Sequence, residues 1–407
     1  MCSSCANSYK HAKCNFVVVI ILFCLLFFNP PARFVAATQT EGDLSQELEN
    51  SISQEIENLD LTELEDYFNQ NYDYFQSVFS VSSYQEFLTA LISGEVLTDF
   101  NSVFLAISSS IKQNISVIVS PLMLILVIVL LLVLFNNIKP KLASDSVSQV
   151  IFFICFSVVT TIVTYLMKNI LLQTLSSITK MQNQMNGIFP ILMLLMNTAG
   201  GSISVKAYQP LVLTLSNLVS NVFVKILFPI VIVIFVLSVI GNLSPKIKVK
   251  NLSDFFSSLF KWIIGLIFTV YMSFMTIQGI TASGADGISI KTAKYAIKNY
   301  IPMLGGYISD GFEVARVGAH IIKNAIGFSG IVFIIITILS PILFIAVMQL
   351  ALKLISGLVE PISDGQTSGL LNSVAKTLSL LMVVIVGVAM MYFVIMFLFM
   401  CSVSGGI

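Results

Sequence analysis

Residues 286–311, DGISIKTAKYAIKNYIPMLGGYISDG, interrupt a chain that otherwise consists mostly of long apolar runs. Within them Lys291, Lys294 and Lys298 are three and four residues apart, so a helix carries them on one face and apolar side chains on the other. The pattern predicts an amphipathic helix between two segments that are long and apolar enough to span a membrane.

A proline and two glycines follow this predicted helix. Pro302 breaks a helix because its ring removes a backbone donor, and Gly305 with Gly306 allows the chain to turn sharply. Irregular backbone is tolerated at membrane depth only where protein or water covers it. The sequence therefore predicts two short helices in a re-entrant or interfacial element near residues 282–327.

The second short helix is expected at about 311–326, where Asp310 and Glu313 give a helix-start signal. Its polar residues recur at steps of three, four and three and so share one face: Glu313, Arg316, His320 and Lys323. Ionisable side chains at membrane depth are often functional, which makes this face a candidate lining for a pathway or gate. The alternative is a surface helix with its charges in water, and the lysine stripe equally suits anionic lipid headgroups.

The composition indicates a membrane protein. Of 407 residues, 56% are hydrophobic and 10% are charged, whereas soluble domains have about 25% charged residues. Six apolar runs are each long enough to cross a hydrocarbon core of about 30 Å. They lie near 114–135, 147–167, 211–240, 255–281, 328–355 and 374–401. We therefore expect an all-α polytopic membrane protein with about six transmembrane helices.

Several features interrupt this series of spans. The third run contains Pro229, which predicts a tilt or a kink. Residues 168–184 form an amphipathic pattern, and the apolar residues after them are too few to span, so a second re-entrant or interfacial element is expected near 168–206. Similar interruptions around Pro190 and Pro302 suggest an internal repeat of helical hairpins, as in many transport folds.

The N-terminal third has a different character. Residues 1–37 have two lysines before a short apolar run and end in Val-Ala-Ala, the pattern of a secretory signal peptide. An uncleaved anchor is the alternative. Residues 38–112 would then be an extracytoplasmic segment and residues 113–407 a multi-span membrane domain. Within the segment, residues 44–68 predict an amphipathic helix, and the more apolar residues 75–107 are expected to pack on the membrane domain.

The balanced net charge conceals an asymmetry. Residues 37–111 include 14 acidic residues and no Lys or Arg, whereas the chain from Lys139 onward has 17 basic and 7 acidic residues. An acidic segment without basic residues is repelled by phosphate backbones, which excludes nucleic-acid binding there.

The lysines in short loops predict the orientation. The loops at 136–146 and 241–254 carry two and three lysines and are expected on the cytoplasmic side, with the mature N-terminus outside. This arrangement puts the basic stretch 282–327 on the outer side, against the usual charge rule. We infer that its charges are held within the protein or face a water path.

The chain lacks the motifs of an enzyme. Its two histidines are His11, in the leader, and His320, and no nucleotide-binding loop, nucleophile motif or zinc-binding motif occurs. Its six cysteines show neither disulfide nor metal-ligand spacing, apart from Cys2 and Cys5 in the leader. We expect no catalytic residues, no cofactor and no metal.

Taken together, the leader, the acidic segment with LDLTELEDYF at 59–68, about six spans and the stretch GISIKTAKYAIKNYIPMLGGYISDG at 287–311 resemble the stage III sporulation protein AE family. The similarity extends over nearly the whole mature chain, and the last stretch is its most specific part. The resemblance implies a protein of endospore-forming bacteria, made in the mother cell and placed in the membrane around the forespore. It carries over no catalytic or ligand-binding residue.

The resemblance also implies partners. Family members belong to a multi-protein channel between mother cell and forespore, with a cytoplasmic ATPase, ring-forming proteins from the same operon and a forespore-anchored protein opposite. Two functions follow as hypotheses. In the first, the chain is a conduit-forming, oligomeric membrane component of that channel. In the second, it is an assembly scaffold that anchors and recruits the other proteins while nothing passes through it.

Overall fold

The computed structural model describes residues 52, 55–94, 119–120, 122–131, 145–243, 249–300, 305–360 and 365–402. In these ranges every regular element is a helix, as the composition predicts. The N-terminal elements are short: α3 (Thr62–Gln70), α4 (Tyr72–Phe79) and α5 (Tyr84–Ser93). The remaining ones are α7 (Asp145–Thr198), α8 (Ser202–Leu218), a π-helix (Val219–Leu227), α9 (Phe228–Leu243), α10 (Lys250–Tyr300), α11 (Gly305–Val359) and α12 (Gln366–Cys401).

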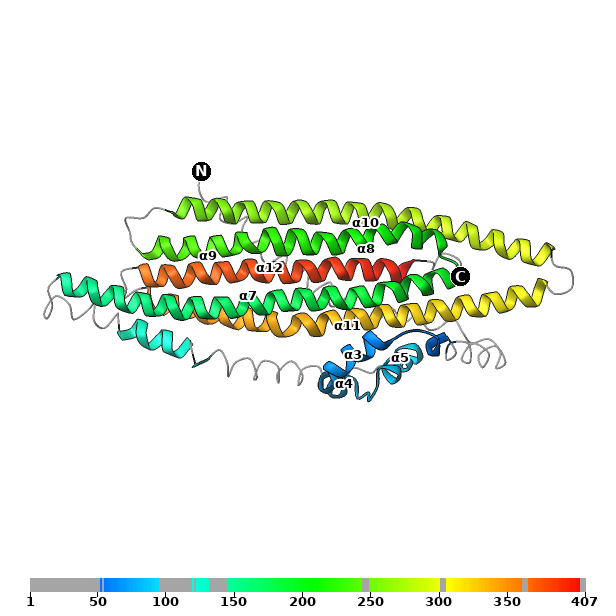
Figure 1. The fold of residues 1–407 in the computed structure, drawn as a ribbon, viewed down its shortest axis with the longest axis horizontal. Coiled ribbons are helices and arrows are strands. Elements are labelled where there is room, and N and C mark those ends of the chain that lie inside the picture. Colours follow the sequence, from blue (N-terminus) through cyan, green and yellow to red (C-terminus); the bar gives the residue numbers. More distant parts are fainter. Residues whose placement is uncertain are drawn as a thin grey trace. The chain divides into compact units, whose positions relative to one another are not determined.

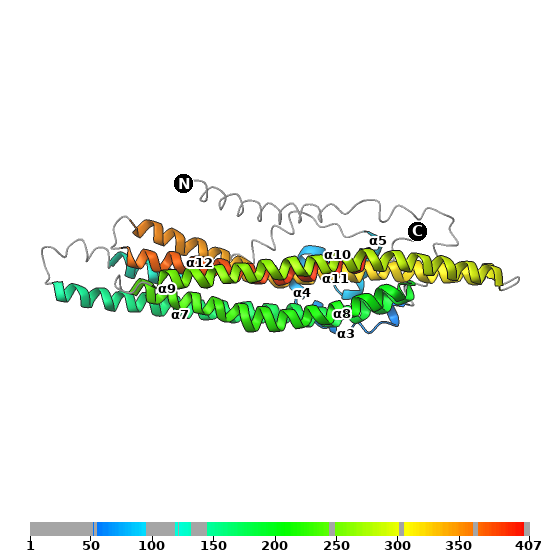
Figure 2. The same cartoon turned by 90° about the horizontal axis from the view of Figure 1, so that it is seen from above.

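The long helices form an antiparallel bundle (Figure 1). The ends of α9 and α11 and the starts of α7, α10 and α12 lie at one end, which we call the proximal end. The ends of α7 and α10, the starts of α8 and α11 and the last turn of α12 lie at the other, distal end. The view in Figure 2 shows α7 and α8 on one side and α10 and α11 on the other. Helix α12 packs against α7, α9, α10 and α11 and has many buried side chains.

Five helical stretches are long and apolar enough to span a membrane, and Leu122–Leu131 is a shorter apolar helix. That short helix corresponds to the middle of the first predicted span, of which residues 114–118, 121 and 132–135 lie outside the described ranges. The other five predicted spans overlap the five stretches. The polytopic all-α class predicted from composition is thus confirmed.

The two short helices predicted around Pro302 are not separate elements. The first is the end of α10, which has 51 residues, and the second is the start of α11, which has 55. Gly305 and Gly306 begin α11, and Pro302 lies outside the described residues. At about 1.5 Å per residue these helices are roughly 75 to 85 Å long, far more than a hydrocarbon core requires.

The predicted element near 168–206 is also largely continuous with its neighbour. Helix α7 runs through Pro190 to Thr198. Ile188 and Phe189 are buried beside this proline, and Phe189 stacks on Phe399 of α12 at 5.6 Å between ring centroids. Packing thus outweighs the helix-breaking tendency of one proline. The chain turns only at Gly200, whose φ of 89° favours glycine.

Pro190 lies inside α7, whereas Pro302 lies outside the described residues, so the predicted repeat stays a prediction. In the third run, a nine-residue π-helix joins α8 to α9 just before Pro229. Proline cannot donate to the carbonyl four residues earlier, here that of Lys225 within the π-helix, and π segments commonly accommodate such gaps. The irregularity expected at Pro229 therefore takes this form.

The short N-terminal helices have their own aromatic core. Phe68, Phe75 and Phe87 are fully buried, and Phe333 of α11 joins them, with ring centroids 5.6 Å from Phe75. Residues 58 and 59 are a turn and a bend and residues 60 and 61 are not helical, so the single helix predicted over 44–68 does not extend through them. Phe75 and Tyr84 pack on Phe333 of α11, as predicted for the start of the 75–107 segment, and residues 95–107 lie outside the described ranges.

Candidate functional site

The polar face predicted on α11 is buried in the bundle rather than exposed to water. Lys323 is fully buried, and Arg316 and His320 are 6% and 9% exposed. Glu313, nearer the start of α11, is partly exposed. The alternative of a surface helix with its charged face in water is therefore wrong for these three side chains.

Lys323 binds the end of α12. Its ammonium group donates to the carbonyl oxygens of Ser402 at 2.6 Å and of Met400 at 3.3 Å. The last carbonyls of a helix lack intrahelical donors and carry a partial negative charge, so a cation there satisfies both. Within the same face, the side-chain amide of Asn324 lies 3.3 Å from Nδ1 of His320.

A second buried charge, this one negative, binds the backbone amides at the start of α8. The Asp286 carboxylate, with no exposed surface, accepts from the amide of Ile203 at 3.0 Å and of Ser204 at 3.2 Å. The first amides of a helix carry a partial positive charge, which an acidic side chain stabilises. Ser202 does not cap this helix with its hydroxyl, which instead donates to Asn197 at 2.8 Å.

Together these contacts form what we call the distal capping site, made of Asp286 and Lys323 with the two helix ends they bind. Tyr208 of α8 lies beside it, 5.3 Å between ring centroids from Phe399 of α12. Burial raises the pKa of Tyr208 to about 12, and the Asp286 carboxylate adds to this rise. Each charge binds a helix end of opposite partial charge. Asp286 joins α10 to the start of α8, and Lys323 joins α11 to the end of α12.

The sequence reasoning identified Lys323 but missed Asp286. The available signal was an aspartate in α10 flanked by Gly284 and Gly287, together with a Gly-Gly-Ser start of α8 that offers unsatisfied amides. That α10 and α8 pack against each other is a tertiary fact that spacing alone does not show.

The other predicted site residues lie apart from this capping site. Lys291 is exposed on α10. The side chains of Lys294, Lys298 and Asp310 and the whole of Pro302 lie outside what the structure describes. The described contacts do not bring the lysine stripe together with Arg316, His320 and Lys323. Any function of the stripe stays a prediction.

The N-terminal helices are fixed to the bundle near its middle. The hydroxyl of Tyr84 lies 2.9 Å from that of Ser329 on α11. Tyr67 shares a hydrogen bond with Thr337, which also accepts from the Gln184 amide of α7 at 2.8 Å. These helices and the residues just before α3 have an acidic surface, whose exposed carboxylates are Glu57, Asp60, Asp66, Asp73 and Glu86. Glu63 is also exposed, but its carboxylate lies beside Gly187 of α7.

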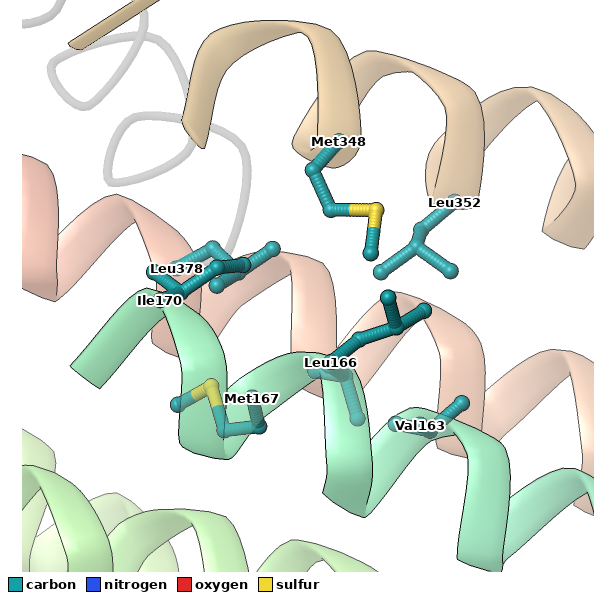
Figure 3. A pocket seen from close by; sticks show the side chains of 8 residues that line it. Val163, Leu166, Met167, Ile170, Met348, Leu352 and Leu378 are labelled. Carbon is teal, nitrogen blue, oxygen red and sulfur yellow. The ribbon is translucent and has the colours of Figure 1, made fainter. Parts of the chain in front are cut away.

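A small pocket lies between α7, α11 and α12, nearer the proximal end (Figure 3). Its lining is wholly apolar: Val163, Leu166, Met167, Ile170, Met348, Leu352, Val374 and Leu378. Ligand sites usually combine an apolar wall with a few converging polar groups. This lining has none, so we interpret the pocket as imperfect packing between the three helices.

Within the described residues, no group of three or more His, Cys, Asp or Glu side chains is arranged to hold a metal ion. Fold and site together define a polytopic helical membrane protein whose buried charges bind helix ends. Residues 82–404 match the sequence model of the family described as stage III sporulation protein AE. The chain belongs to this family.

A curated relative supports the assignment. Stage III sporulation protein AE of Bacillus subtilis (strain 168) is 23% identical over 206 residues, which are 51% of this chain and 52% of the relative. The chain thus spans about half the length of the curated relative it matches. No solved structure matches the chain. The chain is thus a member of a stage III sporulation protein family and has helices long and apolar enough to span a membrane.

Proposed function

We propose that this chain is a membrane component of the channel between mother cell and forespore, and that it serves there as a scaffold. In this role its bundle anchors the N-terminal helices in a fixed position, where they recruit other channel proteins. The observation that carries the proposal is the distal capping site. The charges that would line a path instead hold helix ends together inside the bundle.

The placement of the membrane supports this role. Exposed apolar side chains gather in the proximal half of the long helices, where lipid would cover them. Examples are Val150, Phe153, Ile154 and Val158 on α7, Val233, Val236 and Ile240 on α9, Phe255 and Trp262 on α10, and Leu350, Leu354 and Leu358 on α11. The exposed carboxylates of α3–α5 exclude hydrocarbon at the level of Ser329 and Thr337, because charged groups in lipid are costly. We therefore propose that the distal half of the bundle lies outside the membrane.

This placement accounts for the unusual charge distribution. The rule for loop lysines applies within about 15–20 residues of a span. Residues 291–323 lie at the distal end, beyond the proposed lipid layer, so their charges do not oppose the orientation. In the proposed topology the distal half and the mature N-terminus are extracytoplasmic, and the loops at 136–146 and 241–254 are cytoplasmic.

In the scaffold role, the acidic surface of α3–α5 is the surface that binds the other channel proteins. It is held by Tyr67, Tyr84 and Phe333 at a defined height above the lipid. The proposed partners are those implied by family resemblance: the ring-forming and ATPase proteins of the operon and a forespore-anchored protein opposite. We propose no catalytic activity and no cofactor.

The conduit hypothesis is the alternative. It requires a path that forms between copies or with partners, because Arg316, His320 and Lys323 are buried within one chain. It remains the competing function, and labelling of these positions separates the two.

A charge-reversal experiment tests the scaffold role. Asp66, Asp73 and Glu86 are changed together to Lys in the full chain, and the other channel proteins are co-purified from sporulating cells. The proposal expects normal chain levels, strong loss of co-purification and loss of spore formation. The isosteric control D66N/D73N/E86Q should lose less, since it removes charge without reversing it. Unchanged co-purification in the reversed variant would refute the scaffold role.

A further inference from the structure

Helix α10 carries an exposed apolar stripe along one side. Phe255, Trp262, Leu266, Val270 and Ile288 are separated by seven, four, four and eighteen residues. At about 100° per residue these positions fall within an arc of roughly 80°. Trp262, Val270 and Ile288 are 66%, 60% and 71% exposed. Large apolar side chains exposed on one side of a helix indicate a surface that another structure covers.

Lipid covers only part of this stripe. From Phe255 to Ile288 it extends about 50 Å, at 1.5 Å per residue, against a hydrocarbon core of about 30 Å. Ile288 lies two residues from Asp286, which binds the distal end of the bundle. The distal part of the stripe is therefore outside the membrane and meets water unless protein covers it.

Contacts across the bundle show where Val270 lies along the bundle axis relative to the N-terminal helices. Its neighbour Tyr271 donates to the carbonyl of Met391 on α12 at 2.8 Å. One and a half turns further along α12, Met396 meets Gly330 of α11, beside the Ser329 that binds Tyr84. Val270 thus lies near the height at which the acidic N-terminal helices exclude lipid. Helix α10 lies on the other side of the bundle from them (Figure 1).

Helix α10 is also the least covered of the spans. Only 17% of its most apolar stretch is buried by the rest of the protein, compared with 61% of the corresponding stretch of α12. The first four residues of the stripe are spaced by seven, four and four, which suits packing of one helix along another. These features point to a helix as the covering element.

We propose that the covering helix is α10 of a second copy of this chain, paired in parallel about a twofold axis along the membrane normal. Such an axis brings each residue opposite its own counterpart at the same depth. The stripe passes from lipid into water, so its partner must remain apolar for the same distance beyond the membrane. A second copy carries the same apolar side chains at the same levels.

Lys291 distinguishes this pairing from the binding of another protein. It is exposed and follows Ile288 by three residues, on the same side of α10. In a parallel pair of copies the two Lys291 side chains repel each other, whereas an acidic partner helix would attract them. Removing the charge should therefore strengthen self-pairing and weaken binding to an acidic partner.

Cysteine cross-linking tests the pairing. The full chain, with its native cysteines replaced by serine or alanine, is oxidised in membrane vesicles after the single changes V270C, I288C or M272C. Met272 is the matched control, because it is an exposed apolar residue at the same depth but about 160° around the helix. Disulfide formation requires Cα atoms within about 7 Å, so cross-linked dimer at 272 should be on the order of tenfold lower.

The expected result is a product of twice the chain's mass for V270C and I288C. In the same assay, K291L combined with I288C should increase dimer yield. Equal yields at 270 and 272, no dimer at either stripe position, cross-links only to another protein, or a lower yield with K291L would each overturn the proposal. Pairing concerns α10 alone, so its failure leaves the charge-reversal test of the scaffold unaffected.

Discussion

The ammonium group of Lys323 lies 2.6 Å from the carbonyl oxygen of Ser402 and so joins the distal part of α11 to the last turn of α12. This contact uses a charge that sequence spacing assigned to a pathway. A hydrogen bond to a charged group contributes about 1.5–3 kcal/mol when its partner would otherwise be left unsatisfied. The lysine therefore closes the distal end of the bundle.

Changing Lys323 to Met removes the donor but keeps much of the side chain's volume. We expect hydrogen exchange at Phe399–Ser402 to increase by about tenfold or more, because roughly 1.4 kcal/mol corresponds to a factor of ten. The control is K376M, which removes an exposed lysine from α12, the helix whose last residues are measured. Equal exchange in K323M and the unaltered chain would mean that this contact does not hold the helix end.

Asp286→Ala should loosen the start of α8. Loss of an N-terminal cap destabilises a helix by about 0.5–2 kcal/mol, so exchange at Ile203 and Ser204 should rise by a few-fold up to about 30-fold. D286N keeps an oxygen acceptor and should show a smaller effect. D254N, at an exposed position of α10, serves as the control. Protection that persists in D286A would contradict the assigned role.

Phe333→Ala should release the N-terminal helices from the bundle. A buried Phe→Ala change destabilises by about 3–5 kcal/mol, and Phe333 contacts Tyr67, Phe75 and Tyr84 at once. Limited proteolysis within α3–α5 should accelerate strongly while the bundle remains intact. F312A removes a more exposed ring from the same helix and should leave the cleavage rate nearly unchanged.

High pH should loosen the same interface. Burial raises the pKa of Tyr67 and, more strongly, of Tyr84 above the usual value near 10. The folded state therefore holds these protons more tightly, and the stabilisation is complete below pH 10 and declines as pH rises above it. Proteolysis of α3–α5 should accelerate above pH 10 but not between pH 6 and 9. In Y67F/Y84F the acceleration should shrink, and an unchanged profile would exclude these tyrosines.

Sequence patterns predicted the helical class, the apolar runs and the shared face of Arg316, His320 and Lys323. They failed where tertiary packing outweighs local preference. Pro190 predicts the end of a helix, yet the packing of the buried residues Ile188 and Phe189 keeps α7 continuous. Periodicity shows that a face is polar but not what that face meets. The binding of Lys323 to α12, some 77 to 79 residues away along the chain, therefore needed the structure.

Labelling with a membrane-impermeant thiol reagent tests the central claim most directly. Single cysteines at Arg316 and His320 are compared with exposed positions Lys291 and Phe312, in the presence and absence of the other channel proteins. The scaffold account predicts that K291C and F312C label and that R316C and H320C stay unlabelled in both states. Labelling of 316 and 320 that appears on assembly and stops spore formation would contradict it and support a lined path.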